Sequence, residues 1–113
     1  MAASSADSQV LDRLFAVIEA RRGADPASSY TAKLLAGGAA LPARKLGEES
    51  IETVIAALQG DRAALANESA DLLYHLLVLW AASGLRPADV YAVLGGREGL
   101  SGLAEKAARE KSS

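Results

Sequence analysis

The stretch that decides the fold runs from Arg44 to Trp80 and reads RKLGEESIETVIAALQGDRAALANESADLLYHLLVLW. Apolar residues recur at helical spacing on both sides of Gln59-Gly60-Asp61. A glycine followed by an aspartate is typical of one helix ending and the next being capped. The stretch is therefore predicted to form two antiparallel helices joined by a tight turn, as the centre of an all-α bundle of four to five helices.

Each of the two predicted helices carries acids that share a face. Glu48, Glu49 and Glu52 lie within about 100° of arc on the first helix. Glu68 and Asp71 are three residues apart on the second. In an antiparallel pair the five carboxylates would converge at one level. Asp71 also begins a long apolar run, and a carboxylate beside so much core requires compensation. The pattern predicts a divalent cation site, and carboxylate ligands suit Mg²⁺ or Mn²⁺.

The alternative is an ordinary solvated helix face. It fits Glu48 and Glu49, because Arg44 and Lys45 precede them by one turn and can pair with them. A di-iron bundle is disfavoured, because it needs paired Glu-x-x-His motifs and the chain has a single histidine, His75. A lone histidine inside an apolar run is more often a hydrogen-bonded core residue than a ligand.

Length and composition narrow the class of protein. The 113 residues suffice for one domain, and the net charge of −2 argues against a broad basic surface for nucleic acid. The absence of cysteine excludes disulfides, thiolate zinc sites and cysteine nucleophiles. No signal peptide is recognisable in the first ten residues, and the longest apolar run is shorter than the roughly 20 residues that span a bilayer. We therefore expect a cytoplasmic protein without nucleic-acid or membrane partners.

The rest of the chain divides into three parts. Residues 1–7 are expected to be disordered, 8–97 to form the helical domain, and 98–113 to be a polar, partly helical tail. Within the domain we predict a first helix up to Arg22 and a short helix 30–35 capped by Ser28 or Ser29. A last helix should open at Pro87 and be interrupted at Gly95-Gly96.

The apolar residues of the central pair indicate how it is covered. The first helix carries an apolar arc beside its acids, which should place the acids at the margin of a buried seam; the arc consists of Leu46, Ile51, Val54, Ile55 and Leu58. The second helix is apolar nearly all round after Asp71, so it needs cover on more than one side. So short a chain supplies few covering helices, which predicts completion of the bundle by a homodimer. The alternative is a compact monomer covered by its own first and last helices.

Several strings resemble a known family. E-E-x-x-E at Glu48–Glu52, followed by E-x-x-D at Glu68–Asp71, resembles the MazG-like all-α nucleoside triphosphate pyrophosphohydrolases. Within that superfamily the chain is similar to the phosphoribosyl-ATP pyrophosphatases of histidine biosynthesis, over about residues 10–97. The closer match lies in four strings, SYTAKL from Ser29, KLGEE from Lys45, VIAA from Val54 and ADLLYHLLVL from Ala70.

The resemblance implies an activity and a set of catalytic residues. Water would cleave the α–β phosphoanhydride of 1-(5-phosphoribosyl)-ATP with Mg²⁺, giving phosphoribosyl-AMP and pyrophosphate. The family pattern assigns the metal to Glu49, Glu52, Glu68 and Asp71. Glu48 is either a fifth ligand or the group that positions water. The residues themselves do not separate these roles.

The resemblance also implies substrate-binding residues, at Tyr30, Thr31, Lys33 and Lys45. From spacing alone, a capped and exposed short helix would explain the first three, and solvent-facing ion pairs explain Lys45 equally well. Two other functions stay open. One is a housekeeping pyrophosphohydrolase acting on ordinary or damaged nucleotides with the same acids. The other is a non-enzymatic helical dimerisation module whose acids lie on its surface.

Overall fold

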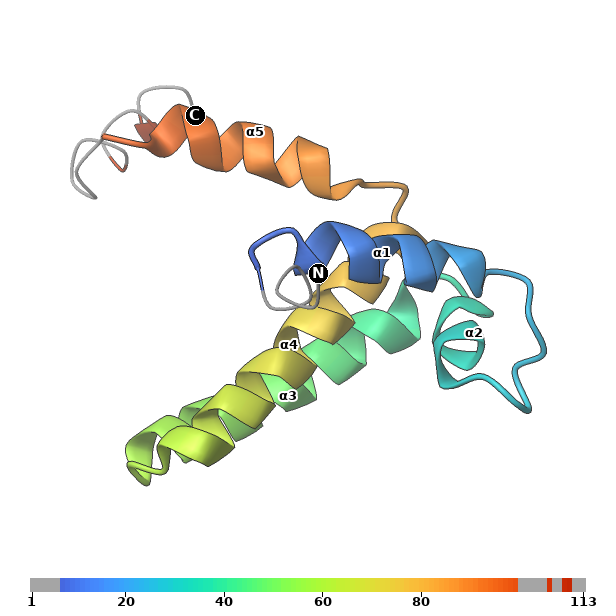
Figure 1. Ribbon diagram of the computed structural model, residues 1–113, viewed down its shortest axis with the longest axis horizontal. Coiled ribbons are helices and arrows are strands. Elements are labelled where there is room, and N and C mark those ends of the chain that lie inside the picture. The colour runs from blue at the N-terminus through green and yellow to red at the C-terminus, as the bar shows by residue number, and fades with distance from the viewer. Residues whose placement is uncertain (1–6, 100–105, 107–108, 111–113) are drawn as a thin grey trace.

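A computed structural model describes residues 7–99, 106, 109 and 110, and helices joined by turns and loops make up most of this part of the chain. The described part contains no strand, which confirms the all-α prediction. Residues 1–6 and most of the predicted polar tail lie outside it. Figure 1 shows the helices in chain order: α1 (Val10–Ala20), α2 (Tyr30–Leu35), α3 (Ala40–Leu58), α4 (Arg62–Ala82) and α5 (Pro87–Arg97).

The two long helices α3 and α4 form the predicted antiparallel hairpin and lie side by side in Figure 1. Gly60 adopts a φ of +74° at the turn, a conformation that glycine reaches without steric penalty. Asp61 then caps α4, because its Oδ1 accepts a hydrogen bond of 3.0 Å from the backbone N–H of Ala64. Local chemistry therefore sets both the end of α3 and the start of α4.

The buried core lies at one end of the hairpin, where α1 and α2 pack against the C-terminal half of α4. Ile18, Leu34, Leu77 and Val78 are almost fully buried there. Phe15 is buried beside them, and Trp80 packs against the cluster while partly buried. Arg22 secures the same end, since its Nη2 donates a hydrogen bond of 2.7 Å to the carbonyl oxygen of Ala81.

Helix α2 begins where the sequence predicts it to begin. The Ser29 hydroxyl accepts a hydrogen bond of 3.1 Å from the backbone N–H of Ala32, so Ser29 is the cap. With only six residues, α2 is too short to be stable by itself. Its position depends on the side chains that join it to its neighbours.

Helix α5 corrects one prediction. Pro87 starts it as expected, but the helix runs through Gly95 and Gly96 to Arg97 instead of being interrupted. A glycine inside a helix costs about 1 kcal/mol, which weakens a helix without ending it. Gly99, two residues beyond the end of α5, adopts a φ of +83°. In Figure 1 α5 leads away from the hairpin, past α1.

The apolar arc of α3 also differs from expectation. Its large residues do not pack against α4 in the single chain: Ile51 is 62% exposed, Val54 56% and Leu58 83%. The face toward α4 instead carries Glu49 and Thr53, which are half-buried, and Ala56, which is buried. Small side chains let the two helices approach closely, so the acids lie within the contact while the large apolar residues lie outside.

The cover over α4 is incomplete within one chain. α1 and α2 bury its C-terminal half, whereas Leu73 remains 42% exposed. In the described part of the chain no single helix is long and apolar enough to cross a membrane. α4 and α5 reach that threshold only as a pair, and the pair is bent by 113° at the break between them.

Candidate active site

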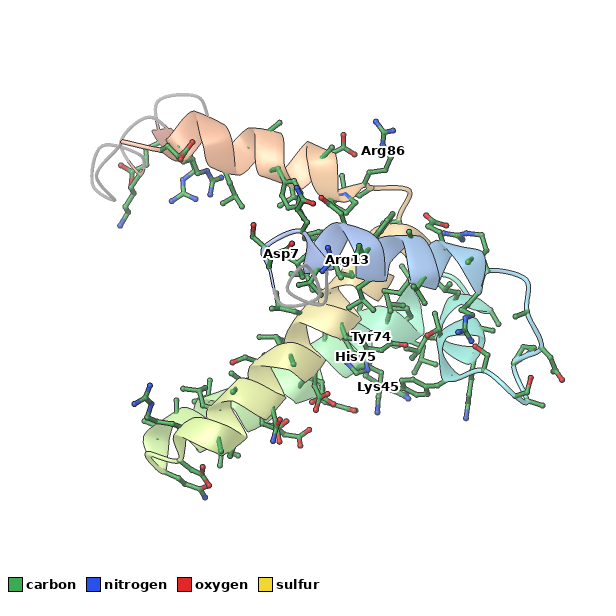
Figure 2. All side chains as sticks on the ribbon, viewed as in Figure 1. Asp7, Arg13, Lys45, Tyr74, His75 and Arg86 are labelled. Atoms are coloured by element: carbon green, nitrogen blue, oxygen red, sulfur yellow. The ribbon has the colours of Figure 1, made fainter. Side chains whose placement is uncertain are left out.

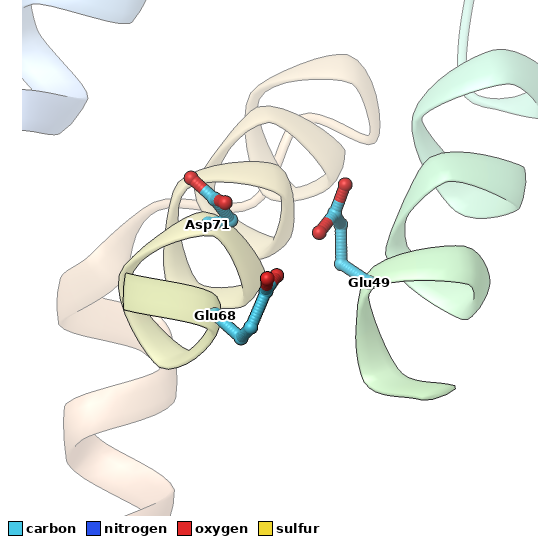
Figure 3. A group of neighbouring side chains, drawn as sticks. All are labelled: Glu49, Glu68 and Asp71. Carbon is cyan, nitrogen blue, oxygen red and sulfur yellow. The ribbon is translucent and has the colours of Figure 1, made fainter. Parts of the chain in front are cut away.

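Three carboxylates converge between α3 and α4. Glu49 projects from α3 toward Glu68 and Asp71 of α4, as Figure 3 shows. One oxygen from each lies within 4.8 Å of the other two. No ion pair in the described part of the chain involves any of the three. Three negative charges at this separation repel one another, and a bound cation would offset that repulsion.

The repulsion acts on the pKa of Glu68 together with the loss of solvent. Loss of solvent raises the pKa of Glu68 above its ordinary value of 4.5, and the charges of Glu52, Asp71 and Glu49 raise it further. A cation bound among these groups would remove the repulsion and favour the ionised form.

The five predicted acids do not all join the group. Glu52 is exposed and outside the group of three, although its charge acts on Glu68. Glu48 forms ion pairs instead, with Lys45 Nζ at 3.4 Å and Arg44 Nε at 3.8 Å. This is the pairing that the solvated-face interpretation expects of Glu48.

Asp71 is a second correction. The sequence places it at the head of a core stripe and predicts a buried charge, but the residue is exposed in the single chain. Glu49 and Glu68 are the half-buried members of the group. The apolar run that follows Asp71 becomes buried only from His75 onward, where α1 and α2 cover it.

Thr53 is the residue of this site that the sequence reasoning missed. Its Oγ1 lies 2.8 Å from the carbonyl oxygen of Glu49 and 3.2 Å from that of Glu68. One hydroxyl thus bridges the two helices beside the acids. The available signal was its spacing, because Glu49, Thr53 and Ala56 follow the i, i+4, i+7 pattern of a single helix face.

Basic residues gather next to the acids, around two hollows that share Tyr30 and Lys33. The smaller hollow, of about 190 Å³, is completed by Leu34, Leu41, Arg44 and Lys45. The larger and more open one, of about 580 Å³, is completed by Pro26, Ala27, Ser28 and Ser29. The smaller hollow therefore has three cationic side chains, and Lys45 stands one turn before Glu49 on α3. An anion can be held there beside a cation held by the acids.

The structure brings together three of the four predicted substrate-binding residues. Tyr30, Lys33 and Lys45 line the smaller hollow. Thr31 is half-buried and lines neither hollow. Its Oγ1 lies 2.5 Å from the Tyr74 hydroxyl oxygen. Figure 2 places the labelled Lys45, Tyr74 and His75 close to one another where α2 meets the hairpin.

Comparison with known proteins identifies the chain's relatives. The family model described as phosphoribosyl-ATP pyrophosphohydrolase matches residues 11–98. The chain belongs to this family. The match spans all five helices except the first residue of α1, so it includes the three acids and both hollows.

Close relatives carry the same description. A phosphoribosyl-ATP pyrophosphatase of Azospirillum brasilense is 60% identical over 97% of this chain and 99% of its own length. One from Parvibaculum lavamentivorans is 67% identical over 93% of this chain and 96% of its own. One from Cereibacter sphaeroides is 61% identical over 88% and 97%. The resemblance to phosphoribosyl-ATP pyrophosphatases, inferred from the four strings that begin at Ser29, Lys45, Val54 and Ala70, is thus confirmed.

Proposed function

We propose that this chain hydrolyses 1-(5-phosphoribosyl)-ATP to 1-(5-phosphoribosyl)-AMP and pyrophosphate, the second step of histidine biosynthesis. Family membership supports the substrate. The observation that carries the chemistry is the group formed by Glu49, Glu68 and Asp71 beside a hollow with three cationic side chains. A polyphosphate needs both parts, because carboxylates alone would repel it.

The acids fit a hard divalent cation, and we assign Mg²⁺, with Mn²⁺ as a substitute. Glu49, Glu68 and Asp71 would hold it, and Glu52 would join them by a change of rotamer. Such an ion supplies Lewis-acid polarisation of the phosphoryl oxygens and neutralises charge on the leaving pyrophosphate.

The protein's own residues position the remaining parts of the reaction. Lys33, Arg44 and Lys45 would bind phosphate oxygens, and Tyr30 would contact the nucleoside. Thr31 would act indirectly, through the Tyr74 hydroxyl. Glu48 is held by Arg44 and Lys45 near the acids, where it can orient or deprotonate the water. Water adds to the α-phosphorus, the bond from that phosphorus to the oxygen bridging it to the β-phosphorus breaks, and the bridging oxygen departs with pyrophosphate.

The proposal is tested by turnover of phosphoribosyl-ATP and of the ordinary nucleoside triphosphates with Mg²⁺, in the wild type and two isosteric variants. Glu49→Gln and Asp71→Asn should lower kcat/KM by at least about 1,000-fold while the fold is retained, since an amide is a poor ligand for Mg²⁺. Glu19→Gln, on the exposed surface of α1, is the matched control and should retain activity.

Two outcomes would overturn this proposal. A clear preference of the wild type for an ordinary triphosphate would favour the housekeeping nucleotide hydrolase. Undiminished hydrolysis in both Glu49→Gln and Asp71→Asn would remove the carboxylate site from the mechanism.

We further propose that two copies pair through the outer face of α3. This outer stripe consists of Ile51, Val54, Ile55 and Leu58, which are all exposed in the single chain and follow the i, i+3, i+4, i+7 spacing of a helix-packing seam. A second α3 presents the same stripe, so a two-fold axis satisfies both. Leu73 of α4 and the apolar residues of α5 add further uncovered surface.

A further inference from the structure

A chain of hydrogen bonds joins the hollow on α2 to the acidic helix α4. The Tyr30 hydroxyl oxygen lies 3.0 Å from Nε2 of His75. Nδ1 of the same ring lies 2.8 Å from the carbonyl oxygen of Asp71. Tyr30 lines both hollows, and Asp71 belongs to the acidic group. His75 therefore joins Tyr30 to the backbone of the helix that carries Asp71.

The chemistry of these partners fixes where the protons are. A carbonyl oxygen can only accept, so Nδ1 of His75 carries a hydrogen and donates it to Asp71. In the neutral ring Nε2 then has a free lone pair, and the Tyr30 hydroxyl donates to it. Both ring nitrogens are satisfied within the protein, and the residue is only 5% exposed. The two hydrogen bonds hold the ring between α2 and the backbone of α4.

Ring packing fixes the same arrangement. His75 contacts Tyr74 edge to face, with ring centroids 5.0 Å apart and planes at 84°. It contacts Tyr30 similarly, at 6.0 Å and 79°. The rings of Tyr30 and Tyr74 lie 6.3 Å apart and nearly parallel, at 22°. Tyr30 is thus held on its inner side while half of it stays exposed.

We propose that His75 is a positioning residue that holds the Tyr30 ring as a wall of the substrate hollow, at a defined place relative to Asp71. The inference rests on the proposed function. The short helix α2 cannot maintain this geometry alone, whereas the buried His75 ring is anchored to the backbone of α4 through Nδ1. Tyr30 contacts the nucleoside part of phosphoribosyl-ATP, so loss of the hydrogen bond weakens substrate binding and leaves the chemical step intact.

The matched test uses two amides in place of the ring. In His75→Gln the amide oxygen would lie near the position of Nε2, where it can still accept a hydrogen bond from Tyr30. The shorter side chain of His75→Asn reaches only the level of Nδ1, so it keeps a donor for Asp71 and loses Tyr30. Tyr30→Phe removes the donor from the other side. We expect Tyr30→Phe and His75→Asn to raise KM for phosphoribosyl-ATP by about threefold to tenfold, the range for one lost hydrogen bond.

In these variants kcat should stay within about twofold of the wild type, because a hydrogen bond that contributes equally to ground-state and transition-state binding changes KM alone. His75→Gln should restore KM. The double variant Tyr30→Phe/His75→Asn should be no worse than either single change, because all remove the same bond. Arg22→Gln, which breaks the hydrogen bond to the Ala81 carbonyl near the C-terminus of α4, controls for general loosening and should lower Tm without raising KM.

A spectroscopic measurement tests the hydrogen bond without turnover. His75 is the only histidine, so the ¹⁵N imidazole spectrum of the tag-free chain reports it alone. We expect the Nδ1–H tautomer in the wild type and a shift of the Nε2 resonance in Tyr30→Phe.

The outcomes separate this inference from the proposed function. A wild type that does not hydrolyse phosphoribosyl-ATP overturns the proposed function. If the wild type is active, three results would overturn only the role of His75. They are a wild-type KM in Tyr30→Phe, the same KM in the two amide variants, and an equal rise of KM in Arg22→Gln. An Nε2–H tautomer in the spectrum also overturns it.

Discussion

Single side chains decide what the acidic group can do. Thr53 is a small residue between Glu49 and Glu68, and its hydroxyl bridges the backbones that carry them. A larger residue there would separate α3 from α4 and move the carboxylates apart. Glu48 has nearly the same sequence context as Glu49 but lies one residue around the helix, so it meets Arg44 and Lys45 instead. One step of about 100° thus separates an ion-paired acid from a candidate ligand.

Glu68 should show the cost of assembling the site without metal. Loss of solvent and the neighbouring acids raise the pKa of Glu68 above 4.5. At a pH between the unfolded and folded pKa values, the folded chain therefore holds a proton that the unfolded chain has released. Stability therefore falls as the pH rises from the unfolded value through the raised folded value. In the presence of a chelator, Glu68→Gln should melt at a higher temperature than the wild type at neutral pH. The difference should vanish as the pH falls toward 4.5.

Melting curves across this pH range, with chelator and then with excess Mg²⁺, check the prediction. With Mg²⁺ the order should reverse, because the wild type gains about 1–3 kcal/mol from a bound ligand well above its dissociation constant and the variant does not. A lower melting temperature for Glu68→Gln in chelator at neutral pH would contradict the expected repulsion.

At the scale of elements, helix ends position the site. The left-handed Gly60 and the Asp61 cap reverse the chain, which aligns Glu49 of α3 with Glu68 and Asp71 of α4. The Ser29 cap starts α2 so that Tyr30 and Lys33 face the hollows. In both places a short polar side chain satisfies a backbone N–H that the helix leaves without a partner.

Removing the cap of α4 should destabilise the chain without changing its chemistry. Asp61→Ala leaves the N–H of Ala64 unsatisfied, which should lower the free energy of unfolding by about 0.5–2 kcal/mol. Asp61→Asn keeps an oxygen acceptor, so its free energy of unfolding should fall much less. Chemical denaturation of the three proteins measures the difference. Equal stability of Asp61→Ala and the wild type would show that the cap contributes nothing at this turn.

The whole molecule leaves much of its large apolar surface uncovered. The exposed large apolar side chains of one chain include the outer stripe of α3, Leu73 of α4, and Tyr91, Val93 and Leu94 of α5. The buried core is confined to the end where α1, α2 and α4 meet. Contiguous exposed apolar side chains are typical of interaction surfaces, which is the physical reason to propose a second copy.

The outer stripe should therefore control the state of association. Val54→Glu places a charge at the centre of the stripe, and we expect it to weaken dimerisation by about 30-fold or more, as loss of a central interface residue does. Val17→Glu is the matched control, since Val17 is also an exposed valine but lies on α1. Analytical ultracentrifugation over a range of concentrations measures both. A wild type that stays monomeric throughout, or equal weakening by both variants, would contradict the proposed pairing.

Much of the local structure was determined by the sequence alone. Gly60, Asp61, Ser29 and Pro87 act through their own backbone preferences and short-range hydrogen bonds, so the helix starts and the central hairpin were predictable. Spacing and the family resemblance predicted five acids, of which the structure brings Glu49, Glu68 and Asp71 together. The continuation of α5 through Gly95 and Gly96 was not predictable, because the penalty of glycine is small compared with that of proline.

Only the tertiary structure decided which side of α3 faces α4. Helical spacing orders the acidic, apolar and small residues around the axis, and a preference for burying large apolar groups points the wrong arc inward. The close approach of the two helices selects Thr53 and Ala56 for the contact, since small side chains leave room for neighbouring backbones. That choice brings Glu49, Glu68 and Asp71 together, separates Glu48 from them, and leaves the outer stripe uncovered. Packing between helices has no signature in the periodicity of either helix alone.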